Sequence, residues 1–312
     1  MNLPKNSILS IIVPVFNEDT CIDEFYSRTV RALSNIQSEF EIVFIDDGSV
    51  DRSMEILNQL QASDSRVKVL SLSRNFGHQN AVIAGLGHCV GDAAVVIDCD
   101  LQDPPELIRQ LFEAWVAGAS VVNAVRTNRE GETYFKKVTA KHFYKIFQHL
   151  VPFEIPLDSG DFRLMDRRVV DTILSLPETN KFVRGLVAWT GFSQVSIDYE
   201  RSSRFAGTTK YSLSKMIKLS IDAITSFSIT PLRYSSAIGL SFFIISILSI
   251  PLVAVLRLLG VSGLGGQATV IEFVVFYGGL NLLILGIIGE YIGHLLSEIK
   301  GRPTYLLKNN NV

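Results

Sequence analysis

The order of apolar and polar positions divides the chain into two parts with different patterns. From residue 7 to residue 125, short runs of Val, Ile and Phe alternate with helix-length segments that carry apolar residues every three or four positions. This alternation is typical of βαβ units that build a parallel sheet. The last third of the chain instead contains long apolar runs. We therefore expect a globular α/β domain followed by a membrane-associated part.

The apolar runs of the first part predict five strands. Their ranges are 8–15, 40–45, 67–72, 93–97 and 120–125. The segments 20–33 and 51–60 show helical spacing of apolar residues, so they are expected to pack on the faces of the sheet. Polar residues directly follow three of the strands, and the carboxyl ends of parallel strands lie along one edge, where ligands bind. We expect these polar strand ends to converge on one site.

Two apolar runs in the last third, at about 235–256 and 270–292, each have roughly 20 residues and are long enough to cross a bilayer as helices. Only Arg257 is basic in the loop between them, whereas several basic residues flank the pair, namely Lys215, Lys218, Arg233, Lys300, Arg302 and Lys308. By the positive-inside rule, both termini are expected on the cytosolic side. The predicted organisation is a cytosolic domain over 1–230, two transmembrane helices within 231–296 and a cytosolic tail over 297–312.

Two further segments leave two interpretations open. The segment 136–153 is rich in Lys, His, Phe and Tyr, and 213–229 mixes lysines with apolar residues at helical spacing. Each segment fits a helix in the membrane interface, and each fits equally a helix packed on the sheet.

The composition excludes several classes of protein. The formal net charge is −2, with 29 Lys and Arg against 31 Asp and Glu, so no broad basic surface for nucleic acid is expected. The three cysteines, Cys21, Cys89 and Cys99, lack CxxC spacing and the five histidines are scattered, so neither a disulfide framework nor a zinc cluster is indicated. The N-terminal region also lacks the cleavage pattern of a signal peptide.

The strongest chemical signal follows the predicted strand at 93–97. Asp98, Asp100 and Gln102 place two carboxylates and an amide oxygen at alternate positions, which suits Mg²⁺ or Mn²⁺. Such a pair of carboxylates also occurs on solvated turns. A calcium-binding EF-hand is excluded, because Asp103 occupies the position that needs Gly and Arg109 the position that needs Glu.

Two other strand ends carry candidate nucleotide contacts. After the strand at 40–45, Asp46 and Asp47 can accept hydrogen bonds from a nucleobase or a ribose, although this segment also fits a turn with a helix cap at Ser49. After the first strand, Glu18 can contact a ribose. A dinucleotide fold would need G-x-G-x-x-G at that point, and this motif is absent there. The glycines at 85–91 have the wrong spacing and predict only a helix end and a turn.

Taken together, these motifs resemble those of family 2 glycosyltransferases. The motifs are VPVFNE (13–18), DDGS (46–49), SRNFGHQNA (73–81), DCDLQDPPE (98–106) and DSGDFRLMDR (158–167). More narrowly, the chain is similar to bacterial polyprenyl-phosphate glucosyltransferases, including the phage-type bactoprenol glucosyltransferases, which are relatives of dolichol-phosphate mannose synthase. The similarity continues through GTTKYSLSKMIKL (207–219), SFSITPLR (226–233) and LGIIGEYIG (285–293). It implies a GT-A type fold, a nucleotide sugar donor, a divalent metal and a lipid phosphate acceptor. With the two apolar runs described above, the expected architecture is a GT-A type domain with a mostly parallel sheet, followed by a two-helix transmembrane hairpin.

The resemblance also implies roles for individual residues. The donor pocket would be lined by Pro14, Asn17, Glu18, Asp46, Asp47 and Asp98, and a divalent cation would be held by Asp98, Asp100 and Gln102. The acceptor phosphate would be bound by Arg126, Lys136, Arg204 and Lys210, each of which also fits a solvated surface charge. Ala140 stands where similar enzymes frequently have Ser, so Thr139 is the available substitute.

The catalytic carboxylates implied by the resemblance are Asp158 and Asp161. A phosphate monoester, with a second pKa of about 6, is largely dianionic at neutral pH and needs little help in losing a proton. Asp158 therefore orients the nucleophile, stabilises a cationic sugar-like transition state or acts as a base, and the sequence leaves these roles open.

The expected function is inverting transfer of a hexose from UDP-glucose to undecaprenyl phosphate at the cytosolic face of the bacterial plasma membrane, for modification of cell-envelope glycans. The implied partners are a nucleotide sugar, a polyprenyl phosphate and the bilayer; self-association of the chain stays open. GDP-mannose or a modified aminopentose donor is the alternative within the same class. A non-catalytic membrane scaffold or lipid transporter is the alternative outside it, but the two apolar runs carry few internal polar residues beyond Glu272 and Glu290.

Overall fold

The computed structural model describes residues 7–34, 36, 38–127, 159–179, 181–200, 228–259 and 267–308. The chain forms two compact units. The first comprises Met1–Gln148, Phe153–Met216 and Arg302–Val312, and the second comprises His149–Pro152 and Ile217–Gly301. The first unit thus includes the end of the chain.

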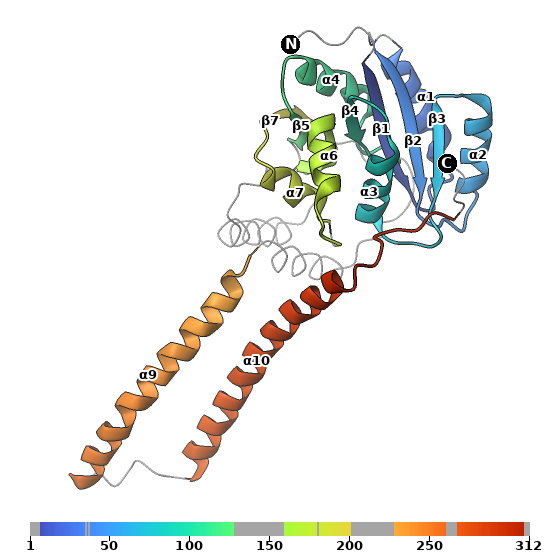
Figure 1. Ribbon diagram of the computed structural model, residues 1–312. Coiled ribbons are helices and arrows are strands. Elements are labelled where there is room, and N and C mark those ends of the chain that lie inside the picture. Colours follow the sequence, from blue (N-terminus) through green and yellow to red (C-terminus); the bar gives the residue numbers. More distant parts are fainter. Residues whose placement is uncertain are drawn as a thin grey trace. The chain divides into compact units, whose positions relative to one another are not determined.

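A seven-stranded sheet forms the centre of the first unit (Figure 1). The strands run in the order β3-β2-β1-β4-β6-β5-β7, and all neighbours are parallel except those of β6. Their bounds are Ile8–Val15 (β1), Glu39–Asp46 (β2), Val67–Ser71 (β3), Ala93–Val96 (β4), Val121–Arg126 (β5), Ser159–Asp166 (β6) and Gln194–Tyr199 (β7). The five predicted strands are confirmed to within a residue or two at their ends. The sequence pattern did not predict β6 and β7.

Helices cover both faces of this sheet (Figure 1). The first face carries α1 (Ile22–Leu33), α2 (Ser53–Ser63) and α4 (Ile108–Val116), which follows a short 3₁₀ turn at Pro105–Leu107. The other face carries α3 (His78–His88), α6 (Arg167–Ser175) and α7 (Val183–Trp189). The predicted helices at 20–33 and 51–60 correspond to α1 and α2, and the glycines at 85–91 do lie at the end of a helix and a turn.

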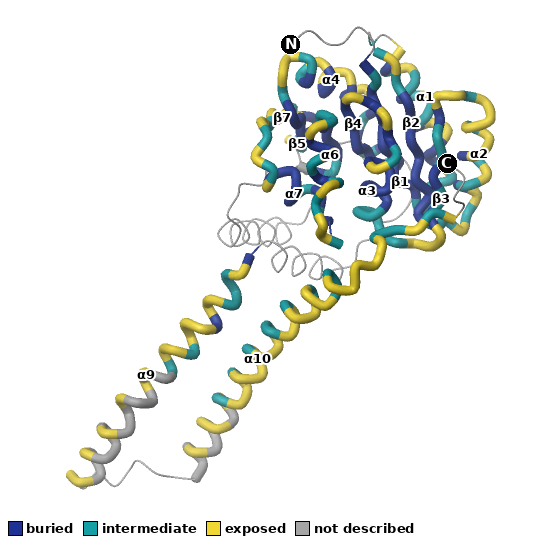
Figure 2. Tube along the Cα trace, viewed as in Figure 1, coloured by how far each residue is buried: buried dark blue, intermediate teal, exposed yellow. Residues whose placement is uncertain are grey.

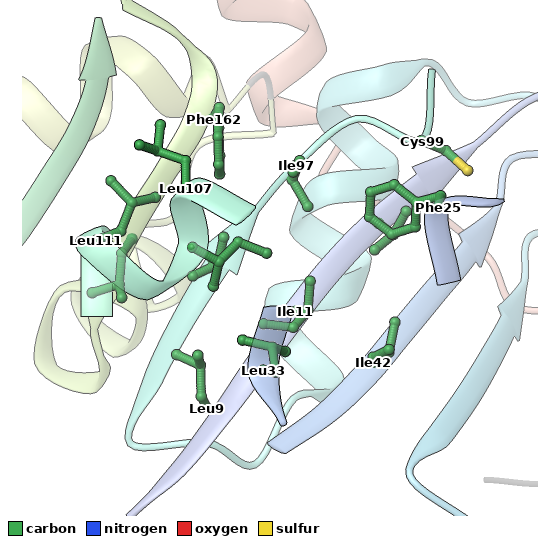
Figure 3. Close-up of a cluster of buried hydrophobic side chains, with 14 of the residues drawn as sticks. Leu9, Ile11, Phe25, Leu33, Ile42, Ile97, Cys99, Leu107, Leu111 and Phe162 are labelled. Carbon is green, nitrogen blue, oxygen red and sulfur yellow. The ribbon is translucent and has the colours of Figure 1, made fainter. Parts of the chain in front are cut away.

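The main core lies between the first face and its helices. Alternate residues of β1, including Leu9 and Ile11, pack with Phe25 and Leu33 of α1 and with Leu111 of α4 (Figure 3). Successive side chains of a strand point to opposite faces, so the other residues of β1 face α3. Both sets are buried, as expected for a sheet covered on two sides (Figure 2).

Helix α3 approaches the sheet closely because it has a glycine at the point of contact. A Cβ atom at Gly85 would lie 2.4 Å from Ile12 Cγ2 and 2.6 Å from Ile45 Cδ1. The absence of a side chain at Gly85 therefore sets the distance between α3 and the strands β1 and β2.

The second unit contains two long helices, α9 (Thr230–Leu258) and α10 (Gln267–Ile299). Phe242 of α9 packs edge-on against Phe276 and Tyr277 of α10. Within the described part of the chain, one helical stretch, Phe276–Ile299, is long and apolar enough to cross a membrane, and none of its most apolar part is buried (Figure 2). It overlaps the predicted span at 270–292, whereas a span at 235–256 stays a prediction. The predicted helices at 136–153 and 213–229 lie outside the described residues, apart from the last two residues of the second.

Substitution of Gly85 by Ala should destabilise the first unit. Overpacking destabilises a core by about 1–3 kcal/mol, whereas Ala is more favourable than Gly in a helix by about 0.5–1 kcal/mol. We therefore expect the free energy of unfolding to fall by about 1–2 kcal/mol. The matched control is Gly87→Ala, because a Cβ there would meet no atom closer than the hydroxyl of Tyr305 at 3.3 Å and Leu174 Cδ2 at 4.0 Å. Denaturant unfolding followed by Trp fluorescence should show a lower midpoint for Gly85→Ala alone; equal midpoints for the two variants would contradict this account of the α3 contact.

Candidate active site

The loops that follow β1 and β2 are joined by hydrogen bonds between backbone and side chains. The N–H of Asn17 donates to Ser49 Oγ (3.0 Å), and the N–H of Val50 donates to Asn17 Oδ1 (2.9 Å). The N–H of Glu18 donates to Ser53 Oγ (3.0 Å). Asn17 has φ of 55°, a backbone conformation that Asn adopts more readily than most residues. Since α2 begins at Ser53, Ser49 is not its cap; its hydroxyl instead links the two predicted donor loops.

Asp47 joins the end of β2 to the segment that leads into α3. Its carboxylate is buried and accepts the N–H of Phe76 on Oδ1 (2.7 Å) and the N–H of Gly77 on Oδ2 (2.9 Å). Burial raises the pKa of Asp47 and these hydrogen bonds oppose that change. Gly48 has φ of +72°, and a Cβ there would lie 2.7 Å from backbone atoms of Arg74 and Asn75. The DDGS and SRNFGHQNA motifs are therefore joined by hydrogen bonds and close packing.

Asp46 and Pro14 lie at the same edge of the sheet. Asp46 Oδ1 accepts the N–H of Ser49 (3.1 Å), and its Oδ2 accepts Ser71 Oγ–H at 3.4 Å. Pro14 lies in β1 beside Ile45 of β2. The structure thus brings five of the six residues predicted to line the donor pocket to the ends of β1 and β2, and the sixth, Asp98, follows β4.

A cluster of partly buried charges lies next to the DDGS and SRNFGHQNA motifs, beginning at the first residue of α3. His78 Nε2 lies 3.2 Å from Asp161 Oδ2 and 3.6 Å from Asp98 Oδ1. Arg184 of α7 binds Asp161 with two hydrogen bonds, from Nε to Oδ1 (2.7 Å) and from Nη2 to Oδ2 (2.9 Å). Gln79 donates to Asp161 Oδ2 (3.4 Å) and accepts the N–H of Val183 (3.1 Å), so it connects α3 to α7.

The neighbours of each group in this cluster set its pKa. Burial alone would raise the pKa of Asp161, but Arg184 and His78 outweigh burial and hold it well below its ordinary value. Burial lowers the pKa of His78, but Asp98 and Asp161 together raise it to about 9. Burial and the nearby carboxylates of Asp161, Asp100 and Asp103 raise the pKa of Asp98 to about 6, against the opposing effect of His78. Asp161 is thus a fixed anion held by two cations, which is a poor arrangement for a general base.

The predicted metal ligands lie on a tight turn after β4. Leu101 has φ of 58°, and the N–H of Gln102 donates to Asp100 Oδ1 (3.1 Å). No group of three or more His, Cys, Asp and Glu side chains is arranged to hold a metal ion in the described ranges. Two carboxylates are nevertheless enough for Mg²⁺, which is commonly bound by one or two carboxylates together with substrate phosphates and water. Burial, together with the carboxylates of Asp161, Asp100 and Asp103, raises the pKa of Asp98, and a divalent cation bound between this turn and a diphosphate would offset the negative charge gathered there.

Arg126, predicted to bind the acceptor phosphate, is held at the end of β5 by two partners. Its Nε donates to Tyr199 Oη (3.1 Å) and its Nη2 lies 3.5 Å from Asp103 Oδ2. Tyr199 Oη in turn donates to Asp103 Oδ1. Asp103 is buried and follows the metal motif directly, so this network ties Arg126 to the same loop as Asp98 and Asp100.

The remaining predicted residues, Asp158, Lys136, Arg204 and Lys210, lie outside the described residues. Sequence reasoning did not assign His78, Gln79, Asp103, Arg184 and Tyr199. His78 and Gln79 stand in the SRNFGHQNA motif, so their position in that motif could have indicated a role in the site. Arg184 gave no such indication, because it lies in a seven-residue helix within a part of the chain that has no clear period.

Comparison with known proteins agrees with this arrangement of motifs. Residues 10–174 match the model of glycosyl transferase family 2. The uncharacterized glycosyltransferase YkcC of Bacillus subtilis is 48% identical over 301 residues, which cover 96% of this chain and 93% of that protein. The bactoprenol glucosyl transferase of Shigella phage SfII is 42% identical over 304 residues, covering 97% of this chain and 98% of that protein.

Among solved structures, glucosyl-3-phosphoglycerate synthase from Mycobacterium tuberculosis aligns with 70% of this chain and 78% of its own, with a TM-score of 0.47 and 18% identity. The family match spans the strands and loops that carry the DDGS and DCDLQ motifs, and the mostly parallel sheet covered on both faces is the GT-A-like fold expected from the sequence. Since the family match covers more than half of the chain and these relatives exceed 40% identity over nearly all of it, the protein belongs to glycosyltransferase family 2.

Proposed function

We propose that this glycosyltransferase transfers glucose from UDP-glucose to undecaprenyl phosphate, with inversion at the anomeric carbon. The observation that carries the proposal is the continuity of the site. Asp47 binds the amides of Phe76 and Gly77, and the next residue, His78, lies beside Asp98 of the metal motif. Loops suited to a nucleotide and carboxylates suited to a diphosphate-bound cation therefore meet at one edge of the sheet.

The donor would lie along the ends of β1 and β2. Asp46 and Asp47 each retain acceptor capacity beyond the bonds described above, because a carboxylate oxygen has two lone pairs. These two residues, with Pro14, Asn17 and Glu18, would line the pocket for the base and ribose, and Asp98 would complete it beside the diphosphate.

A divalent cation, Mg²⁺ or Mn²⁺, would be held by Asp98, Asp100 and Gln102, and when bound it would stabilise the negative charge of the departing diphosphate. Asp161 would act by position: it is held by Arg184 and in turn fixes His78, which lies beside Asp98. Asp158 remains the candidate for orienting the acceptor or accepting a proton.

The acceptor phosphate would be held by Arg126, Lys136, Arg204 and Lys210. A phosphate oxygen would attack the anomeric carbon of the sugar, and the bond from that carbon to the diphosphate oxygen would break on the opposite side, which inverts the configuration. Because the phosphate is largely dianionic at neutral pH, holding and orienting it is the main requirement. The relatives named bactoprenol glucosyl transferase support a polyprenyl phosphate acceptor and a glucosyl donor.

The reaction would take place at the cytosolic face of the bacterial plasma membrane. The exposed apolar side chains of α10 support insertion of that helix in a bilayer, for example Phe273, Leu282 and Leu285. We extend this to a hairpin of spans at 235–256 and 270–292, within 231–296, between a cytosolic domain (1–230) and a cytosolic tail (297–312). The product, a polyprenyl phosphate sugar, would serve modification of cell-envelope glycans.

Transfer of sugar to the lipid is the direct test. The full chain in nanodiscs with undecaprenyl phosphate and Mg²⁺ or Mn²⁺ should form labelled lipid from radiolabelled UDP-glucose. It should form little from GDP-mannose or an aminopentose donor. Asp100→Asn should reduce the rate at least about a hundredfold, because the cation supplies several kcal/mol of charge stabilisation.

The matched control is Asp171→Asn, which changes an exposed carboxylate of α6 and should leave the rate unchanged. Preference for another donor would replace the glucosyl assignment, and no transfer from any donor would favour a non-catalytic scaffold or transporter. Undiminished transfer by Asp100→Asn would refute the metal site.

Arg126→Ala should raise the KM for the lipid about tenfold or more and change the KM for the donor less than about twofold, because a charge-assisted hydrogen bond to phosphate would be lost. Arg109→Ala is the control, since Arg109 is an exposed residue of α4 that pairs with Glu113. Steady-state kinetics with each substrate varied in turn measure both constants. Equal changes in the two KM values would remove Arg126 from the acceptor site.

A further inference from the structure

The end of the chain forms an additional strand contact at the edge of the sheet. Leu307 pairs with Leu72 in an antiparallel bridge, the N–H of Lys308 donates to the carbonyl of Ser71 (2.8 Å), and the N–H of Ser73 donates to the carbonyl of Leu306 (2.8 Å). We refer to residues 302–308, which belong to the first unit, as the docked tail.

This contact is the outermost rung of a ladder that ends in the donor loops. Leu72 is buried, and its N–H donates to the carbonyl of Asp46 (2.9 Å). The N–H of Asp47 then donates to the carbonyl of Val15 (2.9 Å). The ladder therefore runs from the docked tail through 71–73 and 46–47 to the end of β1, at the level of the proposed nucleotide site.

The docked tail also contacts the helix that begins at the site. The ring of Tyr305 lies edge-on to that of His88, with centroids 6.1 Å apart, and its hydroxyl lies beside Gly87. Burial raises the pKa of Tyr305. The tail thus holds both β3, through Leu72, and α3, through Tyr305, and these two elements flank the 73–77 segment whose amides bind Asp47.

The docked tail supplies hydrogen-bond partners to β3 at the edge of the sheet. β3 is the last strand on its side of the sheet, so without the docked tail the carbonyl of Ser71 and the N–H of Ser73 would lose these partners. The backbone of the next two residues, 74 and 75, packs so closely against Gly48 that a Cβ atom at position 48 would lie 2.7 Å from it. The 73–77 segment therefore tolerates little displacement relative to Gly48.

We propose that residues 305–308 are a positioning element for the nucleotide-sugar donor: they hold the 73–77 segment so that Asp46, Asp47 and Asn17 keep the arrangement that binds the nucleotide. This inference rests on the proposed donor site. It assigns to the end of the chain, which follows directly after α10, a role in donor affinity.

Lys308→Pro tests the proposal because proline removes the N–H that bonds to Ser71 while remaining compatible with an extended backbone. Lys308→Ala is the matched control, since it keeps the N–H and changes only an exposed side chain. Loss of one hydrogen bond predicts a rise of about fivefold in the KM for UDP-glucose, with the lipid KM and kcat unchanged. Deletion of 303–312 should raise the donor KM further, whereas deletion of 309–312 should have no effect.

A second measurement does not depend on catalysis. Hydrogen exchange followed by mass spectrometry should show faster exchange of peptides covering 73–77 in Lys308→Pro and in the 303–312 deletion, but not in the two controls. Unchanged exchange in the deletion variant would overturn the proposal even if no transfer could be measured. Equal rises in donor and lipid KM would also overturn it, because they would indicate a general effect on folding.

Discussion

The carboxylate of Asp47 makes the two hydrogen bonds on which the arrangement of the site depends. By accepting the amides of Phe76 and Gly77, it sets where α3 begins, and α3 begins with His78. His78 then lies within 4 Å of carboxylates from two further parts of the chain, Asp98 after β4 and Asp161 on β6. One buried acceptor thus connects the loop suited to a nucleotide with the carboxylates suited to a cation and a reacting sugar.

The charges around His78 and Asp161 form a compact, paired group. A buried carboxylate is costly unless it is paired and hydrogen-bonded, and Asp161 is both, through the planar fork of Arg184. The pairing keeps Asp161 ionised and still. Asp98, beside it, has no comparable fork from an arginine in the described part of the chain, and burial together with the surrounding anions raises its pKa. Asp161 is therefore suited to holding the site together, and Asp98 is suited to receiving a cation.

The fold was predictable where the pattern was strong. The strands at 8–15, 40–45, 67–72, 93–97 and 120–125 are rich in Val and Ile and each precedes a polar turn. Their positions, and the placement of the DDGS and DCDLQ loops at one edge of the sheet, therefore followed from the properties of a parallel sheet. β6 and β7 were missed, because β6 carries Asp161 and Arg163 and is antiparallel, while β7 is a polar edge strand. The role of Arg184 and the docking of Leu307 on Leu72 depend on contacts between distant segments, which no local period encodes.

The central claim is that the donor loops and the metal motif form one site, and it can be tested directly by locating a bound metal and nucleotide. Crystals of the chain with UDP and Mn²⁺, measured at the manganese absorption edge, should show one strong anomalous peak between Asp100 and the diphosphate, with the uridine beside Asp46, Asp47 and Asn17. A manganese peak away from Asp98 and Asp100, or a nucleotide bound away from the ends of β1 and β2, would contradict the account.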